Sequence, residues 1–209
     1  MAVRLRVNNL FRPAASFCLA VVLLASLPAR EGLAVETKAR TAPAKWETLN
    51  GCRLLTQDHR DGDSFHVKYG QQEFVFRLYF VDAPEVDNSF PERNREQCEY
   101  FGVNEQENRA AGEAARDLIA GLLHKPFAVT TRWQNAMGRG RLPRYYAVVT
   151  VGGHDLAEIL VGRGLARAKG AVAALPGGER AKDHMENLRK LEAQAKSKRI
   201  GIWGFLKKL

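Results

Sequence analysis

Cysteine and histidine are scarce in this sequence, and their positions speak against two kinds of chemistry. The 209 residues include three cysteines and five histidines, and the histidines show no zinc-ligand spacing with the cysteines. Neither Cys52 nor Cys98 has the local setting of a catalytic thiol. The sequence therefore argues against a zinc site and against thiol catalysis, and it leaves open whether Cys52 and Cys98 form a disulfide.

The chain also lacks an apolar run long enough for a confident membrane span. The apolar run at residues 14–27 is short, follows the basic stretch "MAVRLRVNNLFR" and is closed by Pro28. A basic segment before a short apolar segment is typical of a signal peptide. We therefore expect a signal peptide at residues 1–34, cleaved after Ala34 or, as a second option, after Ala29, and a secreted or periplasmic protein. The alternative is an uncleaved membrane anchor.

No internal repeat is visible, and neither the composition nor the length indicates disorder or several large domains. Hydrophobic residues make up 45% and charged residues 26% of the chain, which is ordinary for a globular protein. We expect residues 35–44 to form a flexible N-terminal segment and residues 45–206 to form one domain with its own core.

The sequence has fewer acidic than basic residues, and the formal net charge is +9. Removal of residues 1–34 takes away four arginines and one glutamate, which leaves 28 basic against 22 acidic residues and a net charge of +6. A basic helix face is usually a solvated face, but the excess also favours a polyanionic partner. Much of the excess follows Gly162, at Arg163, Arg167, Lys169, Arg189, Lys190, Lys196, Lys198 and Arg199.

The hydrophobic pattern predicts an α+β chain. Five strands are expected at residues 52–57, 64–69, 73–81, 126–133 and 144–151. Three helices are expected at residues 112–123, 155–166 and 184–199, with Asp155 as a helix N-cap. This order favours a five-stranded β-barrel of the oligonucleotide/oligosaccharide-binding (OB) type with about three helices. Residues 86–111 are long for a connection and fit either a short helix or a flap over the site.

The stretch "FRLYFVDAPE", residues 76–85, places an arginine inside an apolar strand and two carboxylates behind it. With a hairpin turn at Gly70–Gln71, Asp63 lies almost opposite Arg77 on the neighbouring strand. Strict alternation would put Arg77 and Asp82 on opposite faces, so the strand must bend or stop between them. The sequence thus predicts that two aspartates and one arginine meet in a single pocket.

Such a group of side chains suits the hydrolysis of a phosphate ester. Asp63 and Asp82 offer hard oxygen ligands, which suit Ca²⁺ or Mg²⁺ rather than zinc. Glu85 follows closely and can take a proton from water or position that water. Arg77 is permanently charged and can bind a phosphate oxygen while negative charge develops on it.

These residues resemble a known family, the thermonucleases or staphylococcal nuclease-like proteins. The motifs that carry the resemblance are "DGDS", "FRLYFVDAPE" and "GLA…LRKLEAQAKSKRIGIW", in the expected order over residues 54–203. The resemblance implies a calcium-dependent phosphodiesterase on a five-stranded barrel, which cleaves DNA and RNA to 3′-phosphorylated products. It implies one Ca²⁺ ion in preference to Mg²⁺, and we expect a monomer with no obligate protein partner.

The resemblance also assigns roles, residue by residue. Asp63 and Asp82 match the family's calcium ligands, and Ala83 matches a position that offers its backbone carbonyl. Arg77 and Glu85 match the family's first catalytic arginine and its catalytic acid.

The second catalytic arginine has two candidates in "MGRGRLPRYYAVV". A gap-free count selects Arg144, whereas the local Gly-Arg pair selects Arg139; we favour Arg144 because residues on strands are held more rigidly. Arg139 and Arg141 are then expected to contact the nucleic-acid backbone. A tyrosine expected after "GLA" is missing, and Tyr145 or Tyr146 is the candidate for stacking on a base in its place.

Two alternatives to an enzyme stay open. The first is a non-catalytic OB-fold module that binds nucleic acid, and the second is a structural envelope protein with vestigial site residues. A binder needs only basic and aromatic residues. The joint presence of Asp63, Arg77, Asp82 and Glu85 therefore favours the nuclease.

Overall fold

The computed structural model describes residues 45–55, 62–138 and 140–205, all within the compact unit Thr37–Leu209. The predicted signal peptide at residues 1–34, the segment 35–44 and Arg139 lie outside the described residues. No helix in the described part of the chain is long and apolar enough to cross a membrane.

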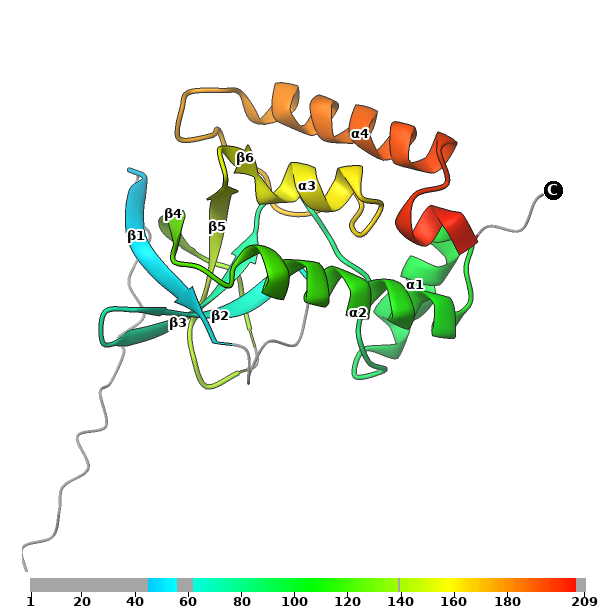
Figure 1. The fold of residues 1–209 in the computed structure, drawn as a ribbon, viewed down its shortest axis with the longest axis horizontal. Coiled ribbons are helices and arrows are strands. Elements are labelled where there is room, and N and C mark those ends of the chain that lie inside the picture. The colour runs from blue at the N-terminus through cyan, green and yellow to red at the C-terminus, as the bar shows by residue number, and fades with distance from the viewer. Residues whose placement is uncertain (1–44, 56–61, 139, 206–209) are drawn as a thin grey trace, which may run out of the picture. The chain divides into compact units, whose positions relative to one another are not determined.

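The described residues form six strands and four α-helices, in the order of three strands, two helices, three strands and two helices (Figure 1). The strands are β1 (Glu47–Leu54), β2 (Ser64–Tyr69), β3 (Gln72–Leu78), β4 (Phe127–Asn135), β5 (Arg144–Val151) and β6 (His154–Asp155). The helices are α1 (Pro91–Phe101), α2 (Glu105–Leu122), α3 (Leu156–Gly162) and α4 (Ala181–Ser197), followed by the 3₁₀ helix η2 (Gly201–Phe205).

The first five strands close into a barrel. The sheet order is β3-β2-β1-β4-β5-β6, and a parallel pairing between β3 and β5 joins the two ends of the five-stranded part. Each of β1 to β5 therefore has a neighbour on both sides, which removes the exposed edges that a flat sheet would have. The α+β class and the five-stranded OB-type barrel are confirmed, with one more α-helix than expected.

The barrel interior is filled by aromatic residues from alternate strand positions. Phe74 and Phe76 on β3 point inward and lie 5.1 and 6.2 Å from the Trp133 ring, measured between ring centroids. Tyr145 joins them, with its ring 5.2 Å from Trp133. Arg77 lies between inward-facing neighbours and therefore points to the outer face of the barrel, where the polar site is built.

The hairpin of β2 and β3 has the predicted register. It turns at Gly70, whose φ of 59° is in the left-handed region that glycine adopts without strain. Ser64 pairs with Arg77, so Asp63 is one residue away from a position opposite Arg77. The prediction from the turn position is confirmed.

The end of β3 gives the break in alternation that the sequence requires. The strand stops at Leu78, earlier than expected, and Phe80 adopts a φ of 70°, which is rare for a bulky residue. The backbone N–H of Phe80 donates to the carbonyl of Ala171 at 2.8 Å, and Asp82 pairs with Arg167 as an isolated bridge. This bend turns Asp82 toward the same side as Arg77.

Residues 86–111 hold more helix than expected. They contain all of α1 and the first turns of α2, which begins at Glu105 instead of residue 112. Asn104 caps α2 in a capping box: its side chain accepts from the N–H of Glu107, and the Glu107 carboxylate accepts from the N–H of Asn104. The predicted cap of α3 is also present, because the Asp155 carboxylate accepts from the N–H of Ala157.

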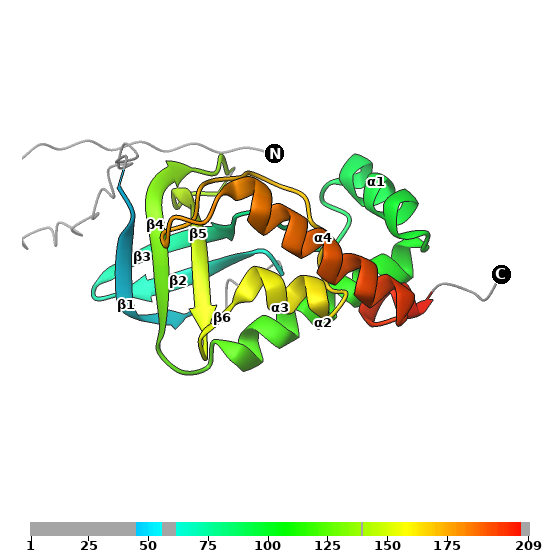
Figure 2. The ribbon, with the colours of Figure 1, turned by 90° about the horizontal axis from the view of Figure 1, so that it is seen from above.

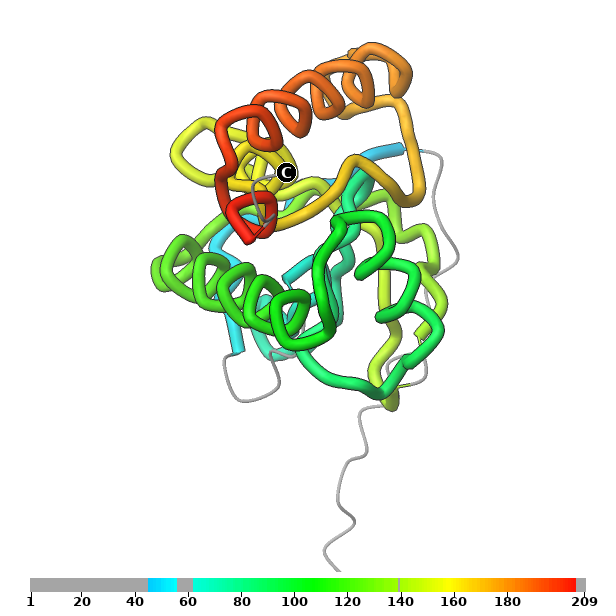
Figure 3. The backbone as a smooth tube through the Cα atoms, turned by 90° about the vertical axis from the view of Figure 1, so that its right-hand side faces the viewer, coloured from blue at the N-terminus to red at the C-terminus, as the bar shows by residue number. Residues whose placement is uncertain are grey.

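The helices cover one side of the barrel, with α4 packed on α3 (Figures 1 and 2). The C-terminal turn η2 comes back beside α1 and α2 (Figure 3). There Trp203 packs on Phe101 of α1, with 5.0 Å between ring centroids. Residues at the end of the chain thus support a helix that begins at residue 91.

Two glycines let α2 approach the loops of the barrel closely. A Cβ atom on Gly112 of α2 would lie 2.6 Å from the carbonyl oxygen of Pro84 and 2.8 Å from that of Glu85. A Cβ atom on Gly62 would lie 2.5 Å from the Cβ of Ala115, also on α2. The chain segments beside Asp63 and Glu85 therefore pack closely against helix α2.

Candidate active site

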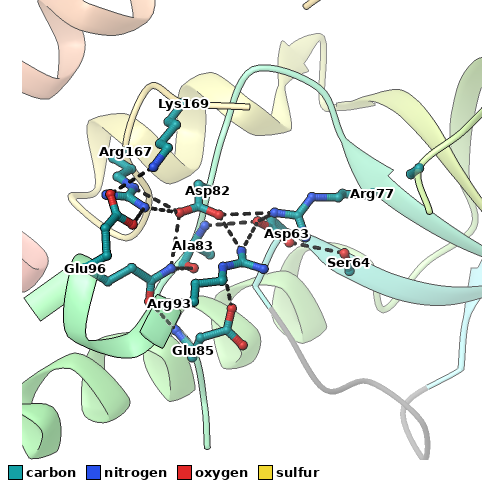
Figure 4. Close-up of polar contacts among 12 residues, drawn as sticks. Asp63, Ser64, Arg77, Asp82, Ala83, Glu85, Arg93, Glu96, Arg167 and Lys169 are labelled. Atoms are coloured by element: carbon teal, nitrogen blue, oxygen red, sulfur yellow. Dashed lines mark hydrogen bonds and ion pairs between the residues drawn. The ribbon is translucent and has the colours of Figure 1, made fainter. Parts of the chain in front are cut away.

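Two aspartates and a glutamate meet at the open end of the β2–β3 hairpin (Figure 4). Asp63 directly precedes β2, whereas Asp82 and Glu85 follow the bend after β3. All three are buried, with exposed fractions of 0% for Asp63, 6% for Asp82 and 7% for Glu85. Buried carboxylates require charged or hydrogen-bonding partners, so their neighbours define the chemistry of the site.

Arg77 joins the two aspartates. Its Nη2 atom lies 2.8 Å from Oδ2 of Asp63 and 3.1 Å from Oδ1 of Asp82. The backbone N–H of Ala83 also donates to Oδ2 of Asp63, at 3.1 Å, and Ser64 donates its hydroxyl to Oδ1 of Asp63. The structure thus brings together Asp63, Arg77, Asp82 and Ala83, as expected from the sequence.

A second arginine enters the cluster from α1. Arg93 forms an ion pair with Oδ1 of Asp82 through Nη2 and another with Oε1 of Glu85 through Nε, the latter at 2.9 Å. Its Nη2 also lies 3.8 Å from Oδ2 of Asp63. Figure 4 shows its guanidinium between the two aspartates and Glu85.

Arg167 supplies a third guanidinium from the far side of Asp82. Its Nε donates to Oδ2 of Asp82 at 2.9 Å, and its Nη1 donates to Oε1 of Glu96 at 2.8 Å. Lys169 binds the same oxygen of Glu96 at 2.8 Å. The fully buried Arg167 also lies over the ring of Tyr100, 4.9 Å from its centroid, so it is fixed by contacts on several sides.

Gln97 of α1 fixes the backbone between Asp82 and Glu85. Its side-chain N–H group donates to the carbonyl of Ala83 at 2.9 Å and to Oδ2 of Asp82 at 3.2 Å. Its side-chain oxygen accepts from the backbone N–H of Glu85 at 3.0 Å and from the side chain of Asn108 at 3.2 Å. Three of the four hydrogen bonds of this buried amide hold the turn that carries the acids, and the fourth ties the amide to α2.

Sequence reasoning missed Arg93, Gln97 and Arg167 as members of the site. Arg93 and Gln97 are four residues apart and therefore project from the same face of α1, but this spacing has meaning only once α1 is recognised as a helix. Arg167 was grouped with the basic residues that follow Gly162. Its position directly after "GLA", in a motif of the family, was the available signal.

The surroundings shift the pKa values of the acids in opposite directions. Burial works against ionisation of Asp82, but the charges of Arg93 and Arg167 and the hydrogen bonds from Arg167 and Gln97 hold its pKa below the usual value. Burial raises the pKa of Glu85, the charges of Asp63 and Asp82 add to this, and Arg93 opposes it. Asp82 is thus stabilised as a carboxylate, whereas Glu85 holds a proton more readily than an ordinary glutamate.

Arg144 lies at the start of β5 on the same outer face as Arg77. In the parallel pairing of β3 and β5, Arg144 is opposite Val75 and Tyr146 is opposite Arg77. The Nη2 atom of Arg144 donates to the carbonyl oxygens of Ala136, at 3.1 Å, and Met137. The guanidinium is therefore held against the loop between β4 and β5.

The residues that were expected to contact the substrate on and beside that loop have different positions in the structure. Arg141 is exposed on the loop, while Arg139 lies outside the described residues. Tyr145 requires a correction: only 1% of it is exposed, because alternation along β5 turns it into the aromatic core, and it offers no face to a base. Tyr146 is on the outer face and stacks on Tyr79, with 4.9 Å between ring centroids.

The oxygen atoms at the site are of the kind that binds a hard cation, but they already accept hydrogen bonds from other side chains. The donors expected for calcium are Asp63, Asp82 and the carbonyl of Ala83. In the described residues, no group of three or more His, Cys, Asp or Glu side chains could hold a metal ion as it stands, although Asp63, Asp82 and Glu85 lie around the same arginines. The atoms that would bind the ion accept instead from Arg77, Arg93 and Gln97.

Cys52 and Cys98, the cysteines in the described part of the chain, are both free. Cys52 is buried on β1, and burial raises the pKa of its thiol to about 11. Cys98 is on α1, and burial is also the main reason that its pKa is raised. Neither thiol belongs to the acid cluster.

A family model described as "Staphylococcal nuclease homologue" matches residues 75–204. The match runs from β3 to η2 and includes Arg77, Asp82, Glu85 and Arg144, while Asp63 lies before it. It also includes α1 and therefore Arg93. Because the match covers more than half of the chain, on a barrel that carries the acid cluster at the predicted place, the protein belongs to the staphylococcal nuclease homologue family.

Proposed function

We propose that this protein is an exported, calcium-dependent nuclease without sugar specificity, which hydrolyses phosphodiester bonds of DNA and RNA to 3′-phosphate products. Membership of the family supports a nuclease-type function with nucleic acid as substrate. The observation that carries the proposal is the meeting of Asp63 and Asp82 on one arginine, with Glu85 beside them. The net positive charge of the chain favours the approach of a polyanion.

Each residue of the cluster has a role that its position suits. Arg77 lies at the end of a strand, held by two carboxylates, and would bind the scissile phosphate as negative charge develops. Arg144, on the same barrel face, would contribute the second positive charge. Glu85 would take a proton from the attacking water or position that water.

The cation would be held by Asp63, Asp82 and the carbonyl of Ala83, which are hard oxygen donors. A bound Ca²⁺ ion would supply positive charge next to the phosphate. The protein's own part is to keep these oxygens together, through the bend after β3 and the hydrogen bonds of Gln97.

The experiment uses the mature chain with supercoiled plasmid and with RNA, in calcium or in excess chelator. We expect both substrates to be cut in calcium and to stay intact in chelator, and phosphatase treatment followed by mass spectrometry should reveal 3′-phosphate ends. Intact substrates under both conditions would contradict the proposal. Mass spectrometry of the exported protein would show whether residues 1–34 are removed.

A second candidate is a module that binds nucleic acid without cutting it. One observation favours it: the three acids are balanced by the guanidinium groups of Arg77, Arg93 and Arg167. A binding module would retain the plasmid in a gel-shift assay, with calcium or without it, and would leave the DNA uncut. The same samples therefore separate the two functions.

A further inference from the structure

We infer that Arg93 is the internal counter-ion of the acid cluster and that a divalent cation can bind there only by displacing it. Arg93 would then set the affinity of the site for metal. The inference rests on the proposed function, because it concerns the metal that this function requires.

The position of one nitrogen atom carries the argument. Nη2 of Arg93 is in ion-pair contact with Oδ1 of Asp82 and lies 3.8 Å from Oδ2 of Asp63. These two oxygens also share Nη2 of Arg77 as a partner, so they are the atoms through which the two aspartates face each other. A cation held by both carboxylates would compete with the Arg93 guanidinium, which already lies against these two oxygens.

The other oxygen of Asp82 offers no alternative route. Oδ2 accepts from Nε of Arg167 at 2.9 Å and from Gln97 at 3.2 Å, and both donors are buried and held by further hydrogen bonds. A metal ion that approaches Asp82 from the side of Asp63 therefore meets Oδ1. At Oδ1 it competes with Arg93 and Arg77 for the same lone pairs.

Arg93 is the more exposed of these two arginines. The side chain of Arg77 is 11% exposed and stands on a barrel strand, whereas that of Arg93 is 31% exposed and projects from α1. Rotation of its side chain carries the charge toward solvent while α1 stays in place, because Gln97 binds the backbone at Ala83 and Glu85. We expect displacement to need a change of rotamer of Arg93 and no change in the fold.

Arg93 and a divalent cation would compete for the acids because both carry positive charge. Arg93 neutralises Asp82 and Glu85, both of them buried, and a divalent cation would meet the same electrostatic need. Substitution of Arg93 by glutamine removes the competing charge but leaves a polar side chain of similar reach. We expect calcium to bind Arg93→Gln more tightly than the parent chain, by on the order of tenfold.

The test is a calorimetric titration of the mature chain with calcium chloride, in the absence of nucleic acid. Arg95→Gln is the matched control, because it removes the same charge from the same helix at an exposed position paired with Glu92. Tighter binding by Arg93→Gln, with Arg95→Gln equal to the parent, would support the inference. Equal or weaker binding by Arg93→Gln would overturn it.

A second measurement separates a change in calcium affinity from a loss of stability in the variant. Thermal unfolding of each chain is recorded with calcium and with chelator. We expect calcium to raise the unfolding temperature of Arg93→Gln by more than that of the parent. An equal rise in both chains would contradict the inference even if the variant is less stable overall.

Plasmid cleavage by the parent chain separates this inference from the proposed function. If the parent cuts DNA in calcium while the calcium affinity of Arg93→Gln is unchanged, only the role of Arg93 is wrong. If the parent cuts nothing and neither chain binds calcium, the proposed function fails together with the inference.

Discussion

At the scale of single residues, Glu85 differs from Asp82 in how firmly its carboxylate is held. Both oxygens of Asp82 accept from nitrogen donors of Arg77, Arg93, Arg167 and Gln97. Glu85 has an ion pair with Arg93 through Oε1. Its carboxylate is thus the less constrained of the two, which suits a group that must gain and lose a proton.

The substitution Glu85→Gln is expected to lower turnover by about 10²–10⁴-fold and to leave nucleic-acid binding intact, because it removes the proton acceptor and the ion pair with Arg93 but keeps the arginines that would bind phosphate. Initial rates of plasmid cleavage measure the effect. The control is Glu92→Gln, an exposed position on α1. Equal rates for Glu85→Gln and the parent would remove Glu85 from the mechanism.

The burial of Tyr145 is a feature of the site that could have been predicted from the sequence. Arg144 and Tyr146 face outward and Tyr145 faces inward, which follows from simple alternation once residues 144–151 are taken as a strand. The outward direction of the half-buried Tyr146 and the burial of Tyr145 were therefore predictable. The contacts of Arg144 with the carbonyls of Ala136 and Met137 were not, because they depend on the path of a loop.

At the scale of elements, α1 is the part of the site that could not be predicted from the sequence. Its buried residues include Asn94 and Gln97 as well as Phe101, so the buried face is largely polar and gives no apolar helical period. These side chains are buried because they bind the acid-bearing turn and Asn108, a partner visible only in three dimensions. The β2–β3 hairpin, in contrast, could be predicted because its turn at Gly70 sets the register locally.

The close packing of α2 on the loops leads to a second prediction. Gly112→Ala would place a methyl group 2.6 Å from the carbonyl oxygen of Pro84, so helix and loop must separate. We expect the free energy of unfolding to fall by about 1–3 kcal/mol, measured by urea denaturation, together with reduced cleavage.

Gly121→Ala is the matched control on the same helix, where a Cβ atom meets nothing within 4 Å. Helix propensity alone should make this variant more stable, by about 0.5–1 kcal/mol. Equal effects of the two substitutions would show that the contact between α2 and Pro84 is unimportant.

At the scale of the whole molecule, Glu96 and Arg167 tie distant parts of the chain together. Glu96 stands on α1, and Arg167, which follows α3, pairs through its backbone with Asp82. The hydrogen bond from Arg167, more than that from Lys169, lowers the pKa of Glu96 to about 2. Arg167 thus links three segments that are far apart in sequence.

This low pKa predicts how stability depends on pH. A carboxylate whose pKa is lower in the folded state contributes stability above its unfolded value of about 4.3, and the contribution is lost as the pH falls toward 2. We expect the parent to lose stability more steeply than Glu96→Gln between about pH 4.5 and 2, and to be more stable at pH 7. Because Glu96 is 47% exposed, solvent screening limits the difference to about 1 kcal/mol.

Urea denaturation at several pH values measures this difference. Glu99→Gln, an exposed position on the same helix, is the control and should follow the parent. Parallel curves for the parent and Glu96→Gln would show that the pair with Arg167 does not stabilise the protein.

The packing of Trp203 on α1 has a consequence for biosynthesis. Helix α1 carries Arg93 and Gln97 to the acids, and its end at Phe101 rests on Trp203, a residue that is synthesised much later. A chain that is still being synthesised lacks this support until residue 203 has been added, and it lacks the ion pair of Asp82 with Arg167 until residue 167 has been added. The acid cluster therefore reaches its final arrangement only after both segments have folded back onto α1 and the turn at Asp82, so its assembly depends on contacts between residues that are far apart in sequence.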